Sequence, residues 1–219
     1  MGRAYRDRGQ YLTEFIGTFF LVLTVCMMVI AGNAAFAPLA IGLSLMIMVY
    51  AGGGISGGHY NPAVSLAAIM TGALPKSQFV PYVLSQVAGA LVASLVALVV
   101  TGKTIAPAPG AGGSNMASLI VESVYTFLLA YVVLNVAVSK RTAGNSYFGA
   151  AIGMAITVAA YSGGALSGGA YNPAVGLGTT IVHATVGDGT WSHLWLYIVG
   201  PFAGAAVAAV VFGVQEKGD

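Results

Sequence analysis

The sequence predicts an all-α membrane protein with six transmembrane helices plus two half-helices in an inverted repeat. Three observations lead to this fold class: an apolar composition, long apolar runs, and a glycine-rich motif that occurs twice. Of the 219 residues, 58% are hydrophobic and only 6% are charged, whereas soluble domains have about 25% charged residues. With a mean hydropathy of +0.87, the chain is expected to lie in a lipid bilayer.

Six apolar runs are candidate membrane spans. Four of them have about 20 residues, enough to cross about 30 Å of hydrocarbon, and the two shorter runs can extend into the glycines beside them. The runs are continuous rather than alternating with a period of two, which disfavours a β-barrel. The expected spans are about Tyr11–Ala31, Pro38–Ala51, Phe79–Val100, Met116–Val138, Tyr147–Ala160 and Leu194–Val214.

A glycine-rich motif that ends in Asn-Pro-Ala occurs once in each half of the chain. The copies are GGGISGGHYNPAVSL at 52–66 and GGALSGGAYNPAVGL at 163–177, and Asn172 follows Asn61 by 111 residues. Asn is a favoured N-cap and Pro is favoured at the first helical position, so each Asn-Pro is expected to start a helix. The following ten-residue segments, Asn61–Met70 and Asn172–Ile181, rise about 15 Å, which is half of the hydrocarbon thickness. Each is expected to be a half-helix.

The repeat divides the chain into two halves, 1–110 and 111–219, each with three spans and one half-helix. Three spans separate the two half-helices. Because this number is odd, the second half-helix must enter the membrane from the opposite face. The two halves are expected to form one domain, with both broken elements meeting near the middle of the bilayer.

The placement of lysine and arginine predicts the orientation, because cytoplasmic loops carry an excess of these residues. With the N- and C-termini in the cytoplasm, only Lys103 of the eight Lys and Arg residues lies outside. The seven on the cytoplasmic side are Arg3, Arg6, Arg8, Lys76, Lys140, Arg141 and Lys217. The predicted location is the plasma or inner membrane of a cell.

The motifs and their surroundings resemble the aquaporin and glycerol-facilitator family, the major intrinsic proteins, over nearly the whole chain. Two Asn-Pro-Ala motifs separated by three spans are a very specific sign of this family. The resemblance rests on SGGHYNPAV at 56–64, SGGAYNPAV at 167–175, Glu14, Glu122, Gln86 and VGPFAGA at 199–205. It implies a right-handed bundle that forms one channel domain, with one pore per chain, and a homotetramer.

The two Asn-Pro-Ala motifs are expected to form the centre of the pore. Each Asn oxygen caps a helix, which leaves the side-chain NH2 free to donate to a passing water or hydroxyl. The N-terminus of each half-helix carries roughly half a positive charge, and two such ends oppose a cation or a migrating proton. The motif residues are Asn61, Pro62, Ala63, Asn172, Pro173 and Ala174. The backbone carbonyls expected to line the two half-pores belong to Gly57, Gly58, His59, Tyr60, Gly168, Gly169, Ala170 and Tyr171.

Glu14 and Glu122 lie within apolar spans, where an ionisable group costs at least a few kcal/mol unless it is paired. One interpretation is a proton relay. The other is that each carboxylate accepts hydrogen bonds from backbone N–H groups of a broken loop. We favour loop support, because the pair is duplicated with the repeat and the family resemblance implies that role.

Val175 departs from the family pattern, which usually has an arginine directly after the second Asn-Pro-Ala as part of the narrowest constriction. Carried over by their spacing from each Asn, the other constriction positions are Ile41, Ala160 and Gly169. None of the four has a polar side chain, so the predicted selectivity filter is wide and apolar. We therefore expect a passive channel for small neutral solutes such as glycerol, urea, metalloid hydroxides, small weak acids or water.

Three alternatives stay open at this point. The first is a water-selective channel. The second is a coupled secondary transporter, since inverted repeats with broken helices also occur in that class. The third is a closed member that conducts nothing. The sequence shows no nucleophile–base pair or metal-ligand cluster, so no enzyme activity, cofactor, metal or nucleic-acid partner is expected. The expected partners are the solutes, water, the lipid bilayer and further copies of the chain.

Overall fold

The computed structural model describes residues 2–216, with side chains from residue 7 onward. In this part of the chain, six helices are long and apolar enough to cross a membrane. They are α1 (Gly2–Ile30), α2 (Ala37–Ser56), α4 (Phe79–Thr101), α5 (Asn115–Val133), α6 (Phe148–Ser167) and α8 (Leu196–Glu216).

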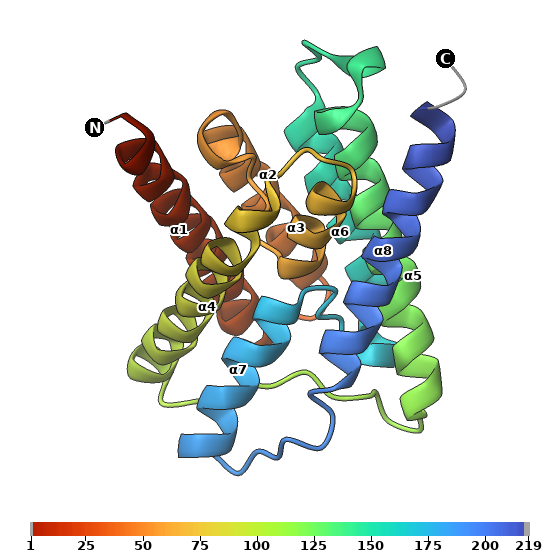
Figure 1. Cartoon of the computed structure of the whole chain (residues 1–219). Coiled ribbons are helices and arrows are strands. Elements are labelled where there is room, and N and C mark those ends of the chain that lie inside the picture. Colours follow the sequence, from red (N-terminus) through yellow and green to blue (C-terminus); the bar gives the residue numbers. More distant parts are fainter. Residues whose placement is uncertain (1, 217–219) are drawn as a thin grey trace.

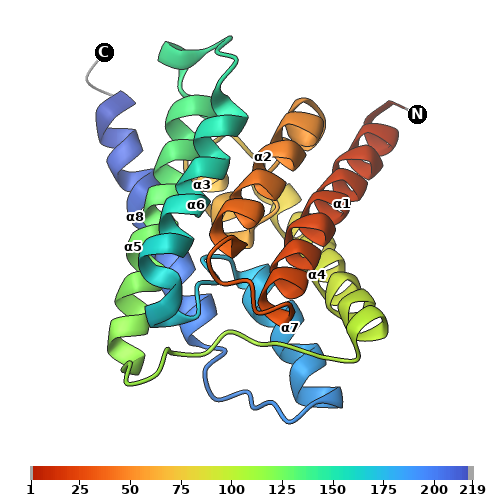
Figure 2. The same ribbon diagram turned by 180° about the vertical axis from the view of Figure 1, so that it is seen from behind.

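The six helices form a bundle with two distinct ends (Figures 1 and 2). Both chain termini lie at one end, which we call the terminal face. The segment 102–114, which joins α4 to α5, lies at the other end, which we call the connector face. This all-helical bundle confirms the predicted fold class.

Two short helices begin near the middle of the bundle, α3 (Pro62–Met70) and α7 (Pro173–Val186). They run in opposite directions, α3 toward the terminal face and α7 toward the connector face (Figure 1). Both begin with proline at the first helical position, as predicted. The expected end of α7 at Ile181 is wrong: the helix has 14 residues, because no glycine or proline occurs between Ile181 and Gly187.

The second span of each half is longer than its apolar run. Helix α2 continues through the glycines at 52–54 to Ser56 and is capped by Gly57, whose φ is 91°. Helix α6 continues to Ser167 and is capped in the same way by Gly168, with a φ of 89°. Helix α5, in contrast, ends early at Val133 and continues as a single π-helical segment, Leu134–Val138.

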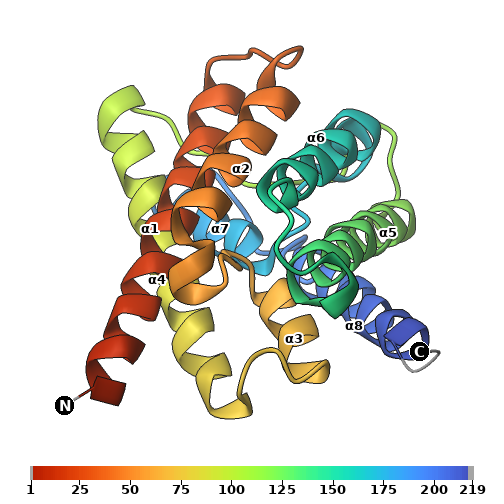
Figure 3. The same cartoon turned by 90° about the horizontal axis from the view of Figure 1, so that it is seen from above.

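Helices α2 and α6 cross at a contact between two glycines, and Figure 3 shows the pair side by side. A Cβ atom on Gly42 would lie 1.8 Å from Thr157 Oγ1 and 2.6 Å from the carbonyl oxygen of Gly153. A Cβ atom on Gly153 would lie 2.5 Å from the carbonyl oxygen of Gly42. The backbones therefore touch at a point where no side chain fits between them.

Candidate pore

Two loops of matching shape, residues 57–61 and 168–172, connect α2 to α3 and α6 to α7. Tyr60 and Tyr171 have the same φ of 49°, and Gly58 and Gly169 have φ values of 64° and 66°. A left-handed conformation costs a non-glycine residue about 1–2 kcal/mol. The surrounding hydrogen bonds must therefore hold each tyrosine in place.

Glu14, fully buried on α1, supplies those hydrogen bonds to the first loop. Its Oε1 accepts from the backbone N–H of His59 over 2.9 Å and from Ser56 Oγ over 2.7 Å. Its Oε2 accepts from the backbone N–H of Tyr60 over 2.7 Å and from Gln86 Nε2 over 2.8 Å. These contacts agree with the loop-support interpretation.

Glu122, fully buried on α5, binds the second loop in the same way. Its Oε1 accepts from Ser167 Oγ over 2.8 Å and from the backbone N–H of Ala170 over 3.1 Å. Its Oε2 accepts from the backbone N–H of Tyr171 over 2.6 Å. The two carboxylates thus have equivalent roles in the two halves.

Two buried tyrosines that the sequence reasoning missed fix the loops from the other side. Tyr82 Oη donates to the carbonyl oxygen of Ser56 over 2.7 Å, and Tyr197 Oη donates to that of Ser167 over 2.5 Å. Tyr197 follows Tyr82 by 115 residues rather than 111. A comparison of the two halves that allowed for this offset would have found the pair.

The first loop has a polar cluster that the second loop lacks. Gln86 Nε2 also donates to Ser65 Oγ over 3.0 Å, and Ser65 Oγ lies 3.0 Å from His59 Nδ1. In the second half, Gly176 and Ala170 stand in the places of Ser65 and His59. His59 is therefore a packed loop histidine, and the two halves differ in polarity beside the pore.

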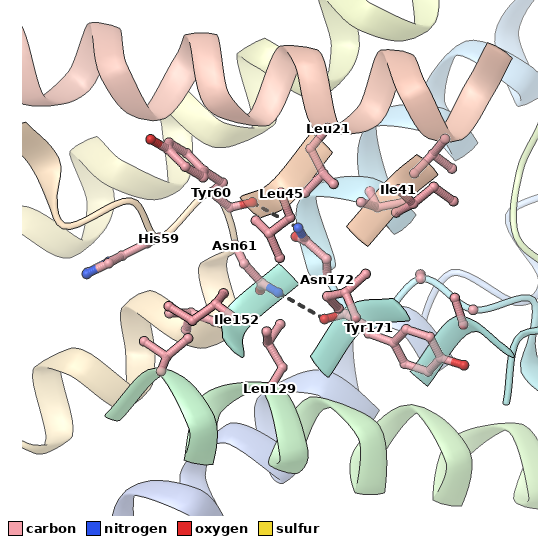
Figure 4. Close-up of a pocket in the computed structure, with 18 of the residues that line it drawn as sticks. Leu21, Ile41, Leu45, His59, Tyr60, Asn61, Leu129, Ile152, Tyr171 and Asn172 are labelled. Carbon is pink, nitrogen blue, oxygen red and sulfur yellow. Dashed lines mark hydrogen bonds between the residues drawn. The ribbon is translucent and has the colours of Figure 1, made fainter. Parts of the chain in front are cut away.

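The side-chain amides of the two motif asparagines are not free, which corrects the prediction. Asn61 Nδ2 donates to the carbonyl oxygen of Tyr171, and Asn172 Nδ2 donates to that of Tyr60, both over 2.9 Å (Figure 4). Each Asn Oδ1 caps its own half-helix, accepting from the backbone N–H of Ala63 or Ala174 over 2.9 Å. One N–H of each NH2 group therefore bonds to the other half, and the second N–H has no hydrogen-bond acceptor among the described residues.

One elongated cavity lies around the two asparagines (Figure 4) and contains all four expected filter positions, Ile41, Ala160, Gly169 and Val175. It is also lined by Gly58, His59, Tyr60, Asn61, Ala170, Tyr171 and Asn172. None of the described residues that line it is Lys, Arg, Asp or Glu. The cavity wall is therefore free of fixed charge.

Gly57 and Gly168 are not among the residues that line this cavity, but Gly57 lines the vestibule that follows it on the terminal face. Both are the C-caps of long helices, so the chain has not yet reached the cavity at these positions. The connector also packs against Gly168, where a Cβ atom would lie 2.6 Å from the carbonyl oxygen of Ala108. The motif prolines and alanines do not line the cavity either; they are buried behind the asparagines.

The cavity is smaller than the small filter side chains led us to expect. Its volume is about 30 Å³. A single water molecule needs about 10–15 Å³ by the same measure. A vestibule of about 500 Å³ follows on the terminal face and shares His59 and Val133 with the cavity. Residues that the sequence reasoning did not identify narrow the cavity near the asparagines: Leu21, Leu45, Leu129 and Ile152 (Figure 4).

The sequence of this chain matches the model of one protein family, described as major intrinsic protein, over residues 3–212. The chain belongs to the major intrinsic protein family. It is 36% identical over 223 residues to glycerol uptake facilitator protein-like 6 of Lactiplantibacillus plantarum, covering 96% of this chain and 99% of that protein. It is also 36% identical to aquaporin NIP1-1 of Zea mays over 214 residues, covering 94% of this chain and 74% of that protein.

A solved structure supports the same fold for this major intrinsic protein. The aquaglyceroporin of Plasmodium falciparum superposes with a TM-score of 0.84 at 20% identity, covering 94% of this chain and 95% of that one. Members of the family are channels and not enzymes, so the chain is an integral membrane protein that forms a passive channel for small solutes. Family membership thereby decides against the coupled transporter.

Proposed function

We propose that this major intrinsic protein conducts small neutral solutes, such as glycerol, urea, undissociated metalloid hydroxides and small weak acids, through the cavity between its pore loops. The observation that carries this proposal is the uncharged filter. Ile41, Ala160 and Val175 contribute apolar side chains there, and Gly169 contributes only backbone. A wall without charge offers an ion nothing that compensates for its lost hydration, whereas a neutral solute loses much less on entering.

The asparagine pair is proposed to orient the solute and to oppose protons. The second N–H of Asn61 and of Asn172 donates to a passing oxygen, and backbone carbonyls of the two loops accept from its hydroxyls. The half-helices α3 and α7 direct their N-termini toward the same place, where roughly half a positive charge on each opposes a cation.

The proposed arrangement in the membrane follows from charge. The terminal face carries Arg8, Lys76, Lys140 and Arg141, whereas Lys103 lies on the connector face. We therefore propose that the terminal face is cytoplasmic. The side chains of Arg3 and Arg6, and Lys217, lie outside the described part of the structure. The repeats 1–110 and 111–219 together form one pore, and the assembly is proposed to be a homotetramer in a plasma or inner membrane.

Stopped-flow light scattering on proteoliposomes tests the proposal with water, glycerol and urea. Three proteins are compared: the natural chain, Val175→Arg and Val175→Met. The methionine variant lengthens the side chain without adding charge, so it separates the effect of size from that of charge. We expect the natural protein to pass glycerol or urea, and Val175→Arg to lose that flux while it keeps water.

A water-selective channel is the second candidate, and the small cavity favours it. A volume of about 30 Å³ has room for two or three water molecules. In that case the natural protein would pass water and exclude both glycerol and urea. This result would overturn the proposed solute class and leave the channel assignment intact.

A further inference from the structure

We propose that Tyr161 is a positioning residue that sets the size limit of the filter, by tying α6 to the turn at the start of α2. The inference rests on the proposed function, since it concerns the selectivity of the same cavity. It starts from two hydrogen bonds, one at each end of the α2–α6 pair.

The first bond lies at the connector face. Tyr161 Oη donates to the carbonyl oxygen of Ala35 over 2.9 Å. Tyr161 directly follows the filter residue Ala160, and Ala35 lies in the turn before α2, six residues before the filter residue Ile41. The bond therefore joins the two helices beside two of the four filter positions.

The second bond is the equivalent of the first at the terminal face. Tyr50 Oη donates to the carbonyl oxygen of Ser146 over 3.1 Å and accepts from the backbone N–H of Ala150 over 3.1 Å. Tyr161 follows Tyr50 by 111 residues, and Ser146 follows Ala35 by the same number. Each tyrosine thus ties its helix to the segment that leads into the partner helix.

The contact between Gly42 and Gly153 lies between these two bonds and acts as a pivot. Gly153 also follows Gly42 by 111 residues, so the crossing point is itself shared by the two halves. The two backbones touch there, and the side chains of Thr157 and Met46 pack against the two glycines. Away from this point the helices diverge, so the hydrogen bonds at the two ends help to set the angle between α2 and α6.

The two tyrosines act on the pore from outside it. Tyr161 is 53% exposed and Tyr50 is 44% exposed, and neither lines the cavity. Both hydroxyls lie on the outer surface of the bundle, and each has a backbone carbonyl as its acceptor. Loss of the Tyr161 bond therefore lets the connector-face ends of α2 and α6 separate, and Ile41 moves away from Ala160.

The test compares Tyr161→Phe with Tyr50→Phe. The second variant loses the same kind of hydrogen bond at the terminal face, away from the filter residues Ile41 and Ala160. Proteoliposomes of the natural protein and of each variant are assayed for water, urea and glycerol permeability. We expect Tyr161→Phe to raise the ratio of glycerol to water permeability about two- to tenfold, the range that one neutral hydrogen bond can supply. Tyr50→Phe is expected to leave this ratio unchanged.

The ratio is independent of how much folded protein each preparation contains, so a merely structural role would scale all solutes equally. An unchanged ratio in Tyr161→Phe, or an equal shift in both variants, would overturn the inference. If the natural protein passes only water, and Tyr161→Phe also passes neither glycerol nor urea, both the inference and the proposed solute class are overturned. A shift confined to Tyr161→Phe, on a natural protein that excludes glycerol, would support the inference and reject that solute class.

Amide hydrogen exchange gives a second measurement that does not depend on flux. Tyr161→Phe is expected to speed exchange in the first turn of α2, where Ala37 N–H bonds to the carbonyl oxygen of Asn33 over 2.9 Å. Tyr50→Phe is expected to speed exchange at the start of α6 instead. Equal exchange at the start of α2 in the natural protein and in Tyr161→Phe would contradict the proposed tie.

Discussion

Asn172 and Tyr60 bind each other across the middle of the molecule, and Asn61 and Tyr171 repeat the bond in the opposite direction. Each half therefore provides one side-chain donor to the loop of the other half. The same asparagines cap the half-helices through Oδ1. One side chain thus fixes its own helix and the facing loop together.

We expect Asn172→Ser to separate these two roles. Serine caps a helix about as well as asparagine, but its hydroxyl cannot both cap α7 and replace the donor to Tyr60. The free energy of unfolding is expected to fall by about 0.5–1.5 kcal/mol, the worth of one hydrogen bond. Thermal unfolding in detergent measures this, with Asn61→Ser as the matched variant. An unchanged unfolding temperature in both would show that the cross bonds contribute nothing.

Glu14→Gln is expected to destabilise the protein more than Glu122→Gln. Glu14 accepts from four donors, whereas Glu122 accepts from three. Glutamine keeps one acceptor oxygen and directs an NH2 group at the remaining donors, and each buried donor left unpaired costs about 1–3 kcal/mol. Unfolding temperatures of the two variants, measured in the same detergent, check the order. Equal losses would mean that the Gln86 bond adds nothing to loop support.

Gly42→Ala is expected to disrupt the α2–α6 crossing, whereas Gly54→Ala on the same helix is not. The new Cβ at position 42 would meet Thr157 and the backbone of Gly153, but open space surrounds position 54. Overpacking of this kind costs about 1–3 kcal/mol, while alanine in an open helical position gains about 0.5–1 kcal/mol over glycine. The unfolding temperature should fall for Gly42→Ala and rise for Gly54→Ala. A fall in both variants would argue against a specific contact at Gly42.

Leu129→Ala is expected to widen the cavity beside the asparagines. Leu129 is buried and lines the cavity, whereas Leu134, five residues further on, is buried outside it. Both truncations remove the same atoms and cost about 2–5 kcal/mol of stability, so Leu134→Ala is the control. Only Leu129→Ala should raise glycerol permeability relative to water in proteoliposomes. Equal ratios in the two variants would place the narrowest point elsewhere.

Much of this fold follows from the sequence because membrane spans and helix starts have strong local signals. The Asn-Pro at 61–62 and at 172–173 marks the first residues of α3 and α7. Glu14 could be assigned to loop support because a carboxylate in an apolar span needs several donors. The end of α7 was not predicted correctly, because a half-span argument supplied its length where the chain offers no stop signal before Gly187.

The width of the pore could not be predicted in the same way. Small residues at positions 160 and 169 indicate a wide filter only if nothing else reaches the cavity. Leu21 and Leu129 do reach it, yet each is one apolar residue among many on a span that is apolar all round. Hydrophobic periodicity is weak on such helices, so it does not distinguish a residue that faces the pore from one that faces lipid.

The reciprocal bonds between Asn61, Tyr171, Asn172 and Tyr60 also govern how the chain can be assembled during synthesis. When the ribosome has made the first half, the amide of Asn61 has no acceptor from Tyr171, which is made 110 residues later. A buried amide without a partner is costly in a membrane. The cross bonds at the centre of the pore can therefore form only after the second loop has been translated and inserted, which makes closure of the pore a late and joint event.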